Sequence, residues 1–208
     1  MNFKDLNNRH AGENILVVGS GISANLIARN SNVFEGLPRV LLNHQCIKGD
    51  IVNDKTYGIF TDNQLDYDID WWSKIKPGVQ LVLPSMHMRY GKKNIYEITK
   101  SNAIIFDYDT RTIKTDRDKI SADNSLYAFC GTATTAVHLA YYLGAKKIIL
   151  VGIDGTTRRD RARDIEDIYP KEVKNANPDA YRTIKKSVIE LLHNLGMPYL
   201  DASQDFIC

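Results

Sequence analysis

Residues 130–154 hold the pattern with the clearest chemical content in this chain. A helix predicted over residues 132–143 opens on a run of small and hydroxyl residues: Gly131, Thr132, Ala133 and Thr134. A buried strand over residues 147–153 follows, and Asp154, a candidate catalytic or ligand residue, stands at its carboxyl end. In parallel α/β sheets, ligands bind outside the carboxyl ends of the strands, where helix N-termini offer free N–H groups and a positive dipole end. The segment therefore predicts an anion-binding site.

A second segment with the same order of elements lies near the N-terminus. An apolar strand runs into a turn made of Gly19, Ser20 and Gly21, and Ser23 is placed to cap the helix that follows. Glycine lets a backbone approach a ligand closely and adopt a positive φ angle. The dinucleotide fingerprint would also need an acidic residue at the end of the second strand, where Asn43 stands instead, so the pattern argues against an NAD enzyme.

Composition bounds the class of protein. A chain of 208 residues suits a single domain over 1–208, which can bury about 70% of its unfolded surface. A net charge of +2 gives no bulk reason to expect nucleic acid as a partner. No apolar run reaches the roughly 18 residues needed to cross a bilayer, and the first residues lack a signal-peptide core, so we expect a cytoplasmic protein. The three cysteines show no metal-binding spacing and predict reduced thiols rather than a metal site.

The order of apolar runs predicts an α/β domain with a mainly parallel sheet flanked by helices. Strands are expected over about 15–19, 39–43, 57–61, 80–84, 103–107, 147–153 and 198–201. Helices are expected over about 24–31, 65–75, 132–143 and 179–195. Residues 1–13 are polar and are expected to dock only lightly.

Residues 155–178 are dense in charge and lack an apolar period. The segment carries four arginines within six residues, among them Arg158 and Arg159. A loop this long within one domain is usually functional, and guanidinium groups bind phosphates through charge-assisted hydrogen bonds. We therefore expect a charged lid that closes over an anionic ligand.

Taken in order, the residues from Val17 to Ser23, Asn43, and the residues from Gly131 to Asp154 resemble a known superfamily. It groups the bacterial CMP-sialic-acid-dependent sialyltransferases, the motility-associated flagellin glycosyltransferases and the 6-hydroxymethylpterin diphosphokinase-like proteins. The resemblance covers about residues 14–154 and implies a Rossmann-like nucleotide-binding transferase domain. It also implies that the nucleotide is contacted by residues of three segments: Gly19, Ser20, Gly21 and Ser23; Asn43; and Gly131, Thr132 and Ala133.

One departure from the superfamily concerns its catalytic base. The histidine that the sialyltransferases carry ahead of the last helix falls near Pro178 in this chain. Histidine is the commonest general base at neutral pH, and two others follow predicted strands. His44 comes directly after Asn43, and His87 comes after the strand at 80–84, so either could supply the base.

The resemblance favours a glycosyltransferase that uses a nucleotide-activated sugar, with a CMP-sugar of the sialic-acid type as donor, an unknown acceptor and no required cofactor. One alternative is a Mg²⁺-dependent pterin-type diphosphokinase, in which Asp154 would hold the metal with Asp160 or Asp164. Another is a nucleotide-binding protein without catalytic activity. The chain could also form a homo-oligomer.

Overall fold

All strands of the main sheet run parallel, in the order β10-β9-β1-β2-β3-β4-β7-β8. They are β1 (Asn14–Val18), β2 (Arg39–Leu42), β3 (Thr56–Ile59), β4 (Gln80–Pro84), β7 (Ile104–Asp109), β8 (Ser125–Tyr127), β9 (Lys147–Val151) and β10 (Tyr199–Asp201). A separate antiparallel hairpin consists of β5 (Arg89–Tyr90) and β6 (Lys93–Asn94). The computed structural model describes residues 1–61, 74–85, 89–90, 93–94, 103–109, 114–155 and 178–203.

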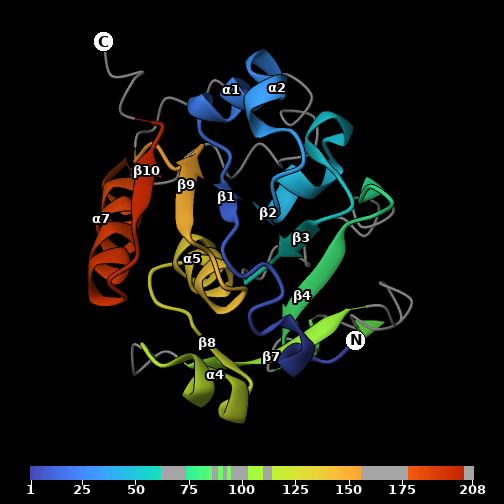
Figure 1. Cartoon of the computed structure of the whole chain (residues 1–208), viewed down its shortest axis with the longest axis vertical. Helices are drawn as coiled ribbons and strands as arrows, with labels where there is room; N and C mark the ends of the chain where they lie inside the picture. Colours follow the sequence, from blue (N-terminus) through green and yellow to red (C-terminus); the bar gives the residue numbers. More distant parts are fainter. Residues whose placement is uncertain are drawn as a thin grey trace.

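Helices cover both faces of the sheet, which gives three layers. One face packs against α4 (Arg117–Asp123), α5 (Thr132–Tyr142), α7 (Pro178–Asn194) and the 3₁₀ helix η1 (Phe3–Leu6). The other packs against α1 (Asn25–Arg29), α2 (Ser31–Phe34) and the 3₁₀ helices η3 (Asn43–Ile47) and η4 (Gly49–Ile51). In Figure 1, α7 lies beside β10 at one edge of the sheet and α4 beside β8 at the other. The predicted α/β, Rossmann-like fold is confirmed.

The two-sided burial explains why the strands are continuous apolar runs. In β1, Ile15 and Val17 belong to the core beneath α5 and α7, whereas Leu16 and Val18 belong to the core beneath α1. All four side chains are fully buried. Burying one such side chain is worth about 1.5–3 kcal/mol, so a polar residue on either face of β1 would be costly.

The direction of the chain reverses between β1 and β9. From β1 the chain moves to its neighbour β2, then on to β3 and β4, while from β9 it moves the opposite way to β10. The segments that leave the carboxyl ends of β1 and β9 therefore diverge. Such a switch point, at the carboxyl edge of the sheet, is where open α/β sheets bind ligands.

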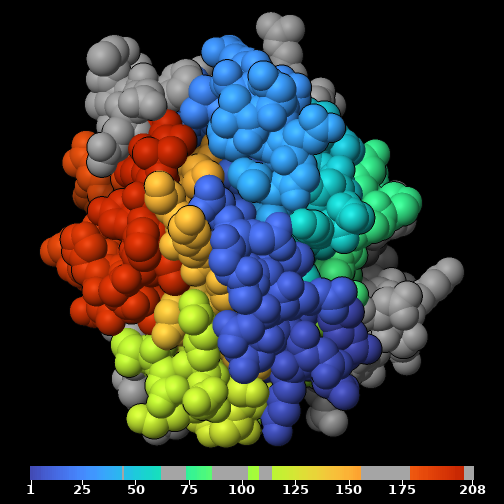
Figure 2. Space-filling model, viewed as in Figure 1, coloured from blue at the N-terminus to red at the C-terminus, as the bar shows by residue number. Residues whose placement is uncertain are grey.

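The N-terminal residues are docked more firmly than the sequence suggested. Phe3 stacks on Tyr142 of α5 with ring centroids 4.7 Å apart, and Leu6 is fully buried. Figure 2 shows this segment in dark blue on the surface, next to α4. The N-terminal segment is polar overall, so its composition did not indicate that Phe3 and Leu6 anchor it to the core.

Most predicted elements are confirmed, and the differences have local causes. The seven expected strands are present with ends within two residues of the prediction. The expected helix at 24–31 breaks at Asn30, whose φ of −125° and ψ of 44° are not helical, into α1 and α2. The elements β8 and α4 were missed, since each is short and α4 buries only Ile120. The helix expected at 65–75 falls almost wholly outside the described residues.

His138 ties α5 to the edge of the sheet. Its ring is fully buried; Nδ1 accepts a 2.6 Å hydrogen bond from the Tyr127 N–H, and Nε2 lies 2.8 Å from the Lys114 carbonyl oxygen. These partners require a neutral ring with its proton on Nε2. His138 is therefore a structural residue, which holds β8 and the segment before α4 against α5.

We expect His138→Leu to lower the free energy of unfolding by about 1–3 kcal/mol, because it removes the hydrogen bonds of the buried imidazole to the Tyr127 N–H and the Lys114 carbonyl. His193→Gln is the matched control: His193 is exposed on α7, and its substitution should change stability by less than about 0.5 kcal/mol. Urea unfolding followed by circular dichroism measures both. Equal stability of His138→Leu and the original protein would contradict the structural role.

Candidate functional site

The loops that follow β1 and β9 are bonded to each other at the switch point. The Gly19 N–H donates to the Val151 carbonyl and the Gly21 N–H to the Gly152 carbonyl, each at 2.8 Å. A Cβ atom on Gly19 would overlap the Gly152 carbonyl oxygen, and one on Gly152 would overlap the Gly19 oxygen. The contact within the protein already requires glycine at both positions. We call this arrangement the β1–β9 clasp.

Ser23 and Asp154 complete the clasp. The Ser23 hydroxyl accepts a 2.6 Å hydrogen bond from the Gly152 N–H and donates to Asp154 Oδ1, while the Ser23 N–H donates to Oδ2 at 3.0 Å. Ser23 is fully buried, and Asp154 is 8% exposed. The prediction that the Ser23 side chain caps a helix is wrong, because Ala24 is the N-cap of α1 and no side-chain cap bond forms there. Asp154, predicted as a catalytic or ligand residue, has both oxygens bonded to Ser23.

Three polar side chains meet on the other side of β1, at the ends of β2 and β3. The hydroxyls of Thr132 and Thr61 lie 2.6 Å apart, and the Thr132 hydroxyl lies 3.5 Å from Asn43 Oδ1. Asn43 directly follows β2, Thr61 comes two residues after β3, and Thr132 is the first residue of α5. We call these residues the threonine–asparagine cluster. Two of them, Asn43 and Thr132, were singled out from the sequence.

The backbone at Asn43 explains why asparagine suits this position. Its φ angle is 49°, in the left-handed region that asparagine tolerates better than most residues. The turn carries the chain from β2 directly into η3 and leaves the Asn43 side chain partly exposed at the carboxyl edge. Thr61 was missed in the sequence. The rule that selected Asn43, a polar residue at the carboxyl end of a buried strand, would also have found it.

The first turn of α5 borders the cluster. Gly131 has a φ of 106°, is partly exposed, and makes no side-chain cap bond as the N-cap. The first N–H groups of an α-helix have no partner within the helix and carry the positive end of its dipole. Thr134 is fully buried, and its hydroxyl donates to the carbonyls of Phe129 and Gly131. It therefore holds the loop before α5 against the first turn of the helix. Ala133 is also buried, so its side chain offers no polar group to a ligand.

A charged cluster lies at the carboxyl end of β10. Lys185 of α7 places its Nζ 2.9 Å from Asp201 Oδ2 and donates to the Ser203 hydroxyl at 2.6 Å. The Asp201 side chain is only 3% exposed, and its ion pair with Lys185 offsets part of the cost of burying the carboxylate. The aliphatic part of Lys185 packs against Gly155, next to the clasp. The sequence analysis did not single out these residues.

Several predicted site residues cannot be placed. The backbone of His44 lies in η3 beside Asn43, but its side chain falls outside the described part of the structure, as do His87, Arg158 and Arg159. The lid expected at 155–178 also lies outside it, apart from its end residues. Ser20 is exposed on the β1 loop, between the clasp residues Gly19 and Gly21.

Comparison with known proteins adds no relative. No family model and no curated protein sequence matches the chain. Within the described ranges, no helix is long and apolar enough to cross a membrane. In the same ranges, no three His, Cys, Asp or Glu side chains are grouped closely enough to hold a metal ion.

We expect Gly19→Ala to lower the free energy of unfolding by about 2 kcal/mol or more, because the new methyl group overlaps a backbone oxygen that β9 holds in place. Gly49→Ala is the matched control. Its methyl group would lie 3.4 Å from Lys76 Cε, an ordinary contact with a flexible side chain, so the change should stay within about 1 kcal/mol. Thermal and urea unfolding measure both variants, and a Gly19→Ala protein as stable as Gly49→Ala would contradict the clasp.

Proposed function

We propose that this protein is a nucleotide-dependent transferase, and specifically a glycosyltransferase that uses a CMP-sugar as donor. The observation that carries the proposal is the threonine–asparagine cluster. Asn43 and Thr132 are separated by 89 positions in the chain, yet they meet at the carboxyl edge beside the start of α5. The resemblance to the sialyltransferase superfamily assigns nucleotide contacts to the same two residues.

The cluster supplies the kinds of groups that bind a nucleoside monophosphate. Hydroxyl and amide side chains both donate and accept hydrogen bonds, which suits a ribose or a base edge. The amides at the start of α5 suit the phosphate, because they have no partner within the helix and lie at the positive end of its dipole. Ser20, which is exposed on the β1 loop, could reach the same ligand.

The proposed reaction moves the sugar from phosphate to an acceptor hydroxyl. The bond between the anomeric carbon and the phosphate oxygen breaks, and its electron pair stays on the phosphate. The amides of the α5 N-terminus stabilise the charge that develops there. The acceptor oxygen bonds to the anomeric carbon, and its proton passes to a general base. His44 and His87 are the candidates for that base.

The clasp residues have a supporting part in this proposal. The side chains of Ser23 and Asp154 are occupied by each other, so we assign them to shaping the β1 loop rather than to the chemistry. The exposed part of that loop then forms one wall of the nucleotide site, and the α5 N-terminus forms the other.

Replacing Thr132 tests the site without changing the shape of the side chain. We expect Thr132→Val to weaken CMP binding about tenfold or more, because it removes a hydroxyl that a buried polar ligand atom would otherwise bond. Thr135→Val is the control on the same helix: its buried hydroxyl has no hydrogen-bond partner among the described residues, so its loss should leave binding and folding unchanged. Isothermal titration calorimetry measures the affinities. Equal CMP affinity in a folded Thr132→Val protein would contradict the proposed site.

Metal dependence separates the two transferase reactions. A CMP-sugar transferase that holds its phosphate with amides and hydroxyls should bind CMP equally well with Mg²⁺ and with EDTA. A diphosphokinase needs the metal to bridge the phosphates of ATP. A thermal-shift panel of CMP, CDP, UDP, GDP and ATP, with and without Mg²⁺, measures this. A ligand at 100 times its Kd adds about 2.7 kcal/mol of stability. Stabilisation by ATP and Mg²⁺ alone, followed by AMP release, would overturn the proposed reaction.

A further inference from the structure

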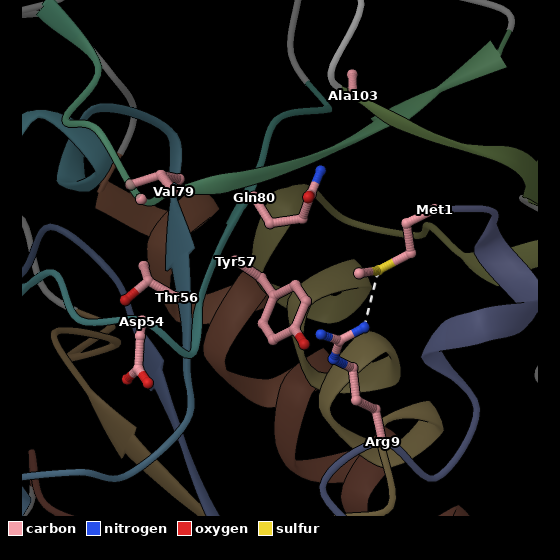
Figure 3. Close-up of a pocket in the computed structure, with 9 residues that line it drawn as sticks. Met1, Arg9, Asp54, Thr56, Tyr57, Val79, Gln80 and Ala103 are labelled. Carbon is pink, nitrogen blue, oxygen red and sulfur yellow. Dashed lines mark hydrogen bonds between the residues drawn. The ribbon is translucent and has the colours of Figure 1, made fainter.

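A cavity lies at the amino edge of the sheet, opposite the edge that holds the threonine–asparagine cluster. It has a volume of about 410 Å³ and opens between the N-terminal segment and the starts of β3 and β4. Figure 3 shows Tyr57 at its centre, with Gln80 above the ring and Val79 toward one side. Volumes of this order hold small molecules in other proteins. The amino ends of the strands are not where the fold binds its main ligand, so this cavity is separate from the nucleotide site.

A chain of hydrogen bonds fixes the tyrosine at the centre of the cavity. Lys55 Nζ lies 2.7 Å from Glu13 Oε2, the other oxygen of Glu13 lies 2.9 Å from His10 Nδ1, and His10 Nε2 lies 2.9 Å from the Tyr57 hydroxyl. The bonds from Lys55 and His10 hold the pKa of Glu13 below its ordinary value, so Glu13 is a carboxylate and accepts from both.

The state of Tyr57 follows from this chain. His10 Nδ1–H donates to the Glu13 carboxylate, and His10 Nε2 is paired with the Tyr57 hydroxyl. Burial raises the pKa of Tyr57, which keeps it a neutral phenol. Tyr57 is only 4% exposed, so a small part of its ring faces the cavity, where it forms a rigid, uncharged floor.

The two charged side chains that line the cavity lie on opposite sides of this floor. Figure 3 shows Arg9 at the hydroxyl end of the Tyr57 ring, and Asp54 on the opposite side of the ring, beside Thr56. Arg9 donates to the Met1 sulfur at 3.0 Å, a weak acceptor for a guanidinium. In the described part of the chain neither Arg9 nor Asp54 forms an ion pair. A cation and an anion therefore face one cavity without neutralising each other.

We propose that this cavity binds an elongated zwitterion, a small molecule with a carboxylate at one end and an ammonium group at the other. Arg9 binds the carboxylate through paired N–H donors, and Asp54 binds the ammonium group. The apolar middle of the ligand lies along the Tyr57 ring and Val79. A ligand with only one charge would leave the opposite charged side chain without a partner. The Tyr57 ring lies between Arg9 and Asp54 in Figure 3, so the two charges of the ligand must be separated by an apolar middle.

Four probes of related structure test this on the full chain, with no nucleotide present. 6-Aminohexanoate carries both charges at opposite ends, hexanoate and hexylamine carry one each, and glycine carries both close together. We expect 6-aminohexanoate to bind at least tenfold more tightly than the other three, as measured by isothermal titration calorimetry. Equal binding of hexanoate, hexylamine or glycine, or no saturable binding of 6-aminohexanoate, would overturn the proposal.

Matched charge changes locate the site. Arg9→Gln and Asp54→Asn should each weaken 6-aminohexanoate binding about tenfold or more. The controls Arg182→Gln and Glu190→Gln remove exposed charges on α7, far from the cavity, and should leave the affinity unchanged. Retained affinity in folded Arg9→Gln or Asp54→Asn would place the ligand elsewhere and overturn the proposal. Because CMP is absent from these titrations, their outcome is independent of the proposed transferase activity.

Discussion

The close approach of two backbones, at the carboxyl ends of β1 and β9, is the constraint on which the carboxyl edge of this sheet depends. Gly19 and Gly152 meet without room for a Cβ atom on either, and the two loops exchange hydrogen bonds directly. Strand β1 is therefore held on one side by its pairing with β9 and by the clasp above it, and on the other by its pairing with β2. The buried Ser23–Asp154 contact then fixes where the β1 loop turns toward α1.

This constraint decides which side of the switch point remains open. Between β1 and β9 the polar groups are used within the protein. At the ends of β2 and β3, the Asn43 side chain is partly exposed, and the N-terminus of α5 lies beside it at the same edge. The β1–β9 clasp and the threonine–asparagine cluster are linked through α5. This helix packs on β1, β2 and β3, so its first residue reaches the edge where Asn43 and Thr61 lie. We therefore centre the proposed nucleotide site on β2, β3 and α5.

The sequence predicted the fold well because nearly every strand is buried on both faces and is therefore a run of apolar residues. It singled out Asn43 and Thr132, whose side chains lie close together, because each stands at the boundary of an element that the pattern makes visible. The role of Gly19 and Gly21 was harder to predict. A glycine next to a strand allows the close approach of either a ligand or another backbone segment. Only the position of β9, more than 120 residues later in the chain, decides which of the two lies there. Lys185 and the cavity around Tyr57 could not be predicted, because their partners lie far away in the chain.

Hydrogen–deuterium exchange of the amides, measured with and without saturating CMP, tests the location of the nucleotide site most directly. The account predicts slower exchange with CMP at residues 131–135, where the amides of α5 would bind the phosphate, and at residues 43–47 beside Asn43. The amides around Arg9, Asp54 and Tyr57 at the amino edge should exchange at the same rate in both samples. Protection at the amino edge instead, or unchanged exchange at 131–135 under conditions where calorimetry shows CMP bound, would contradict it.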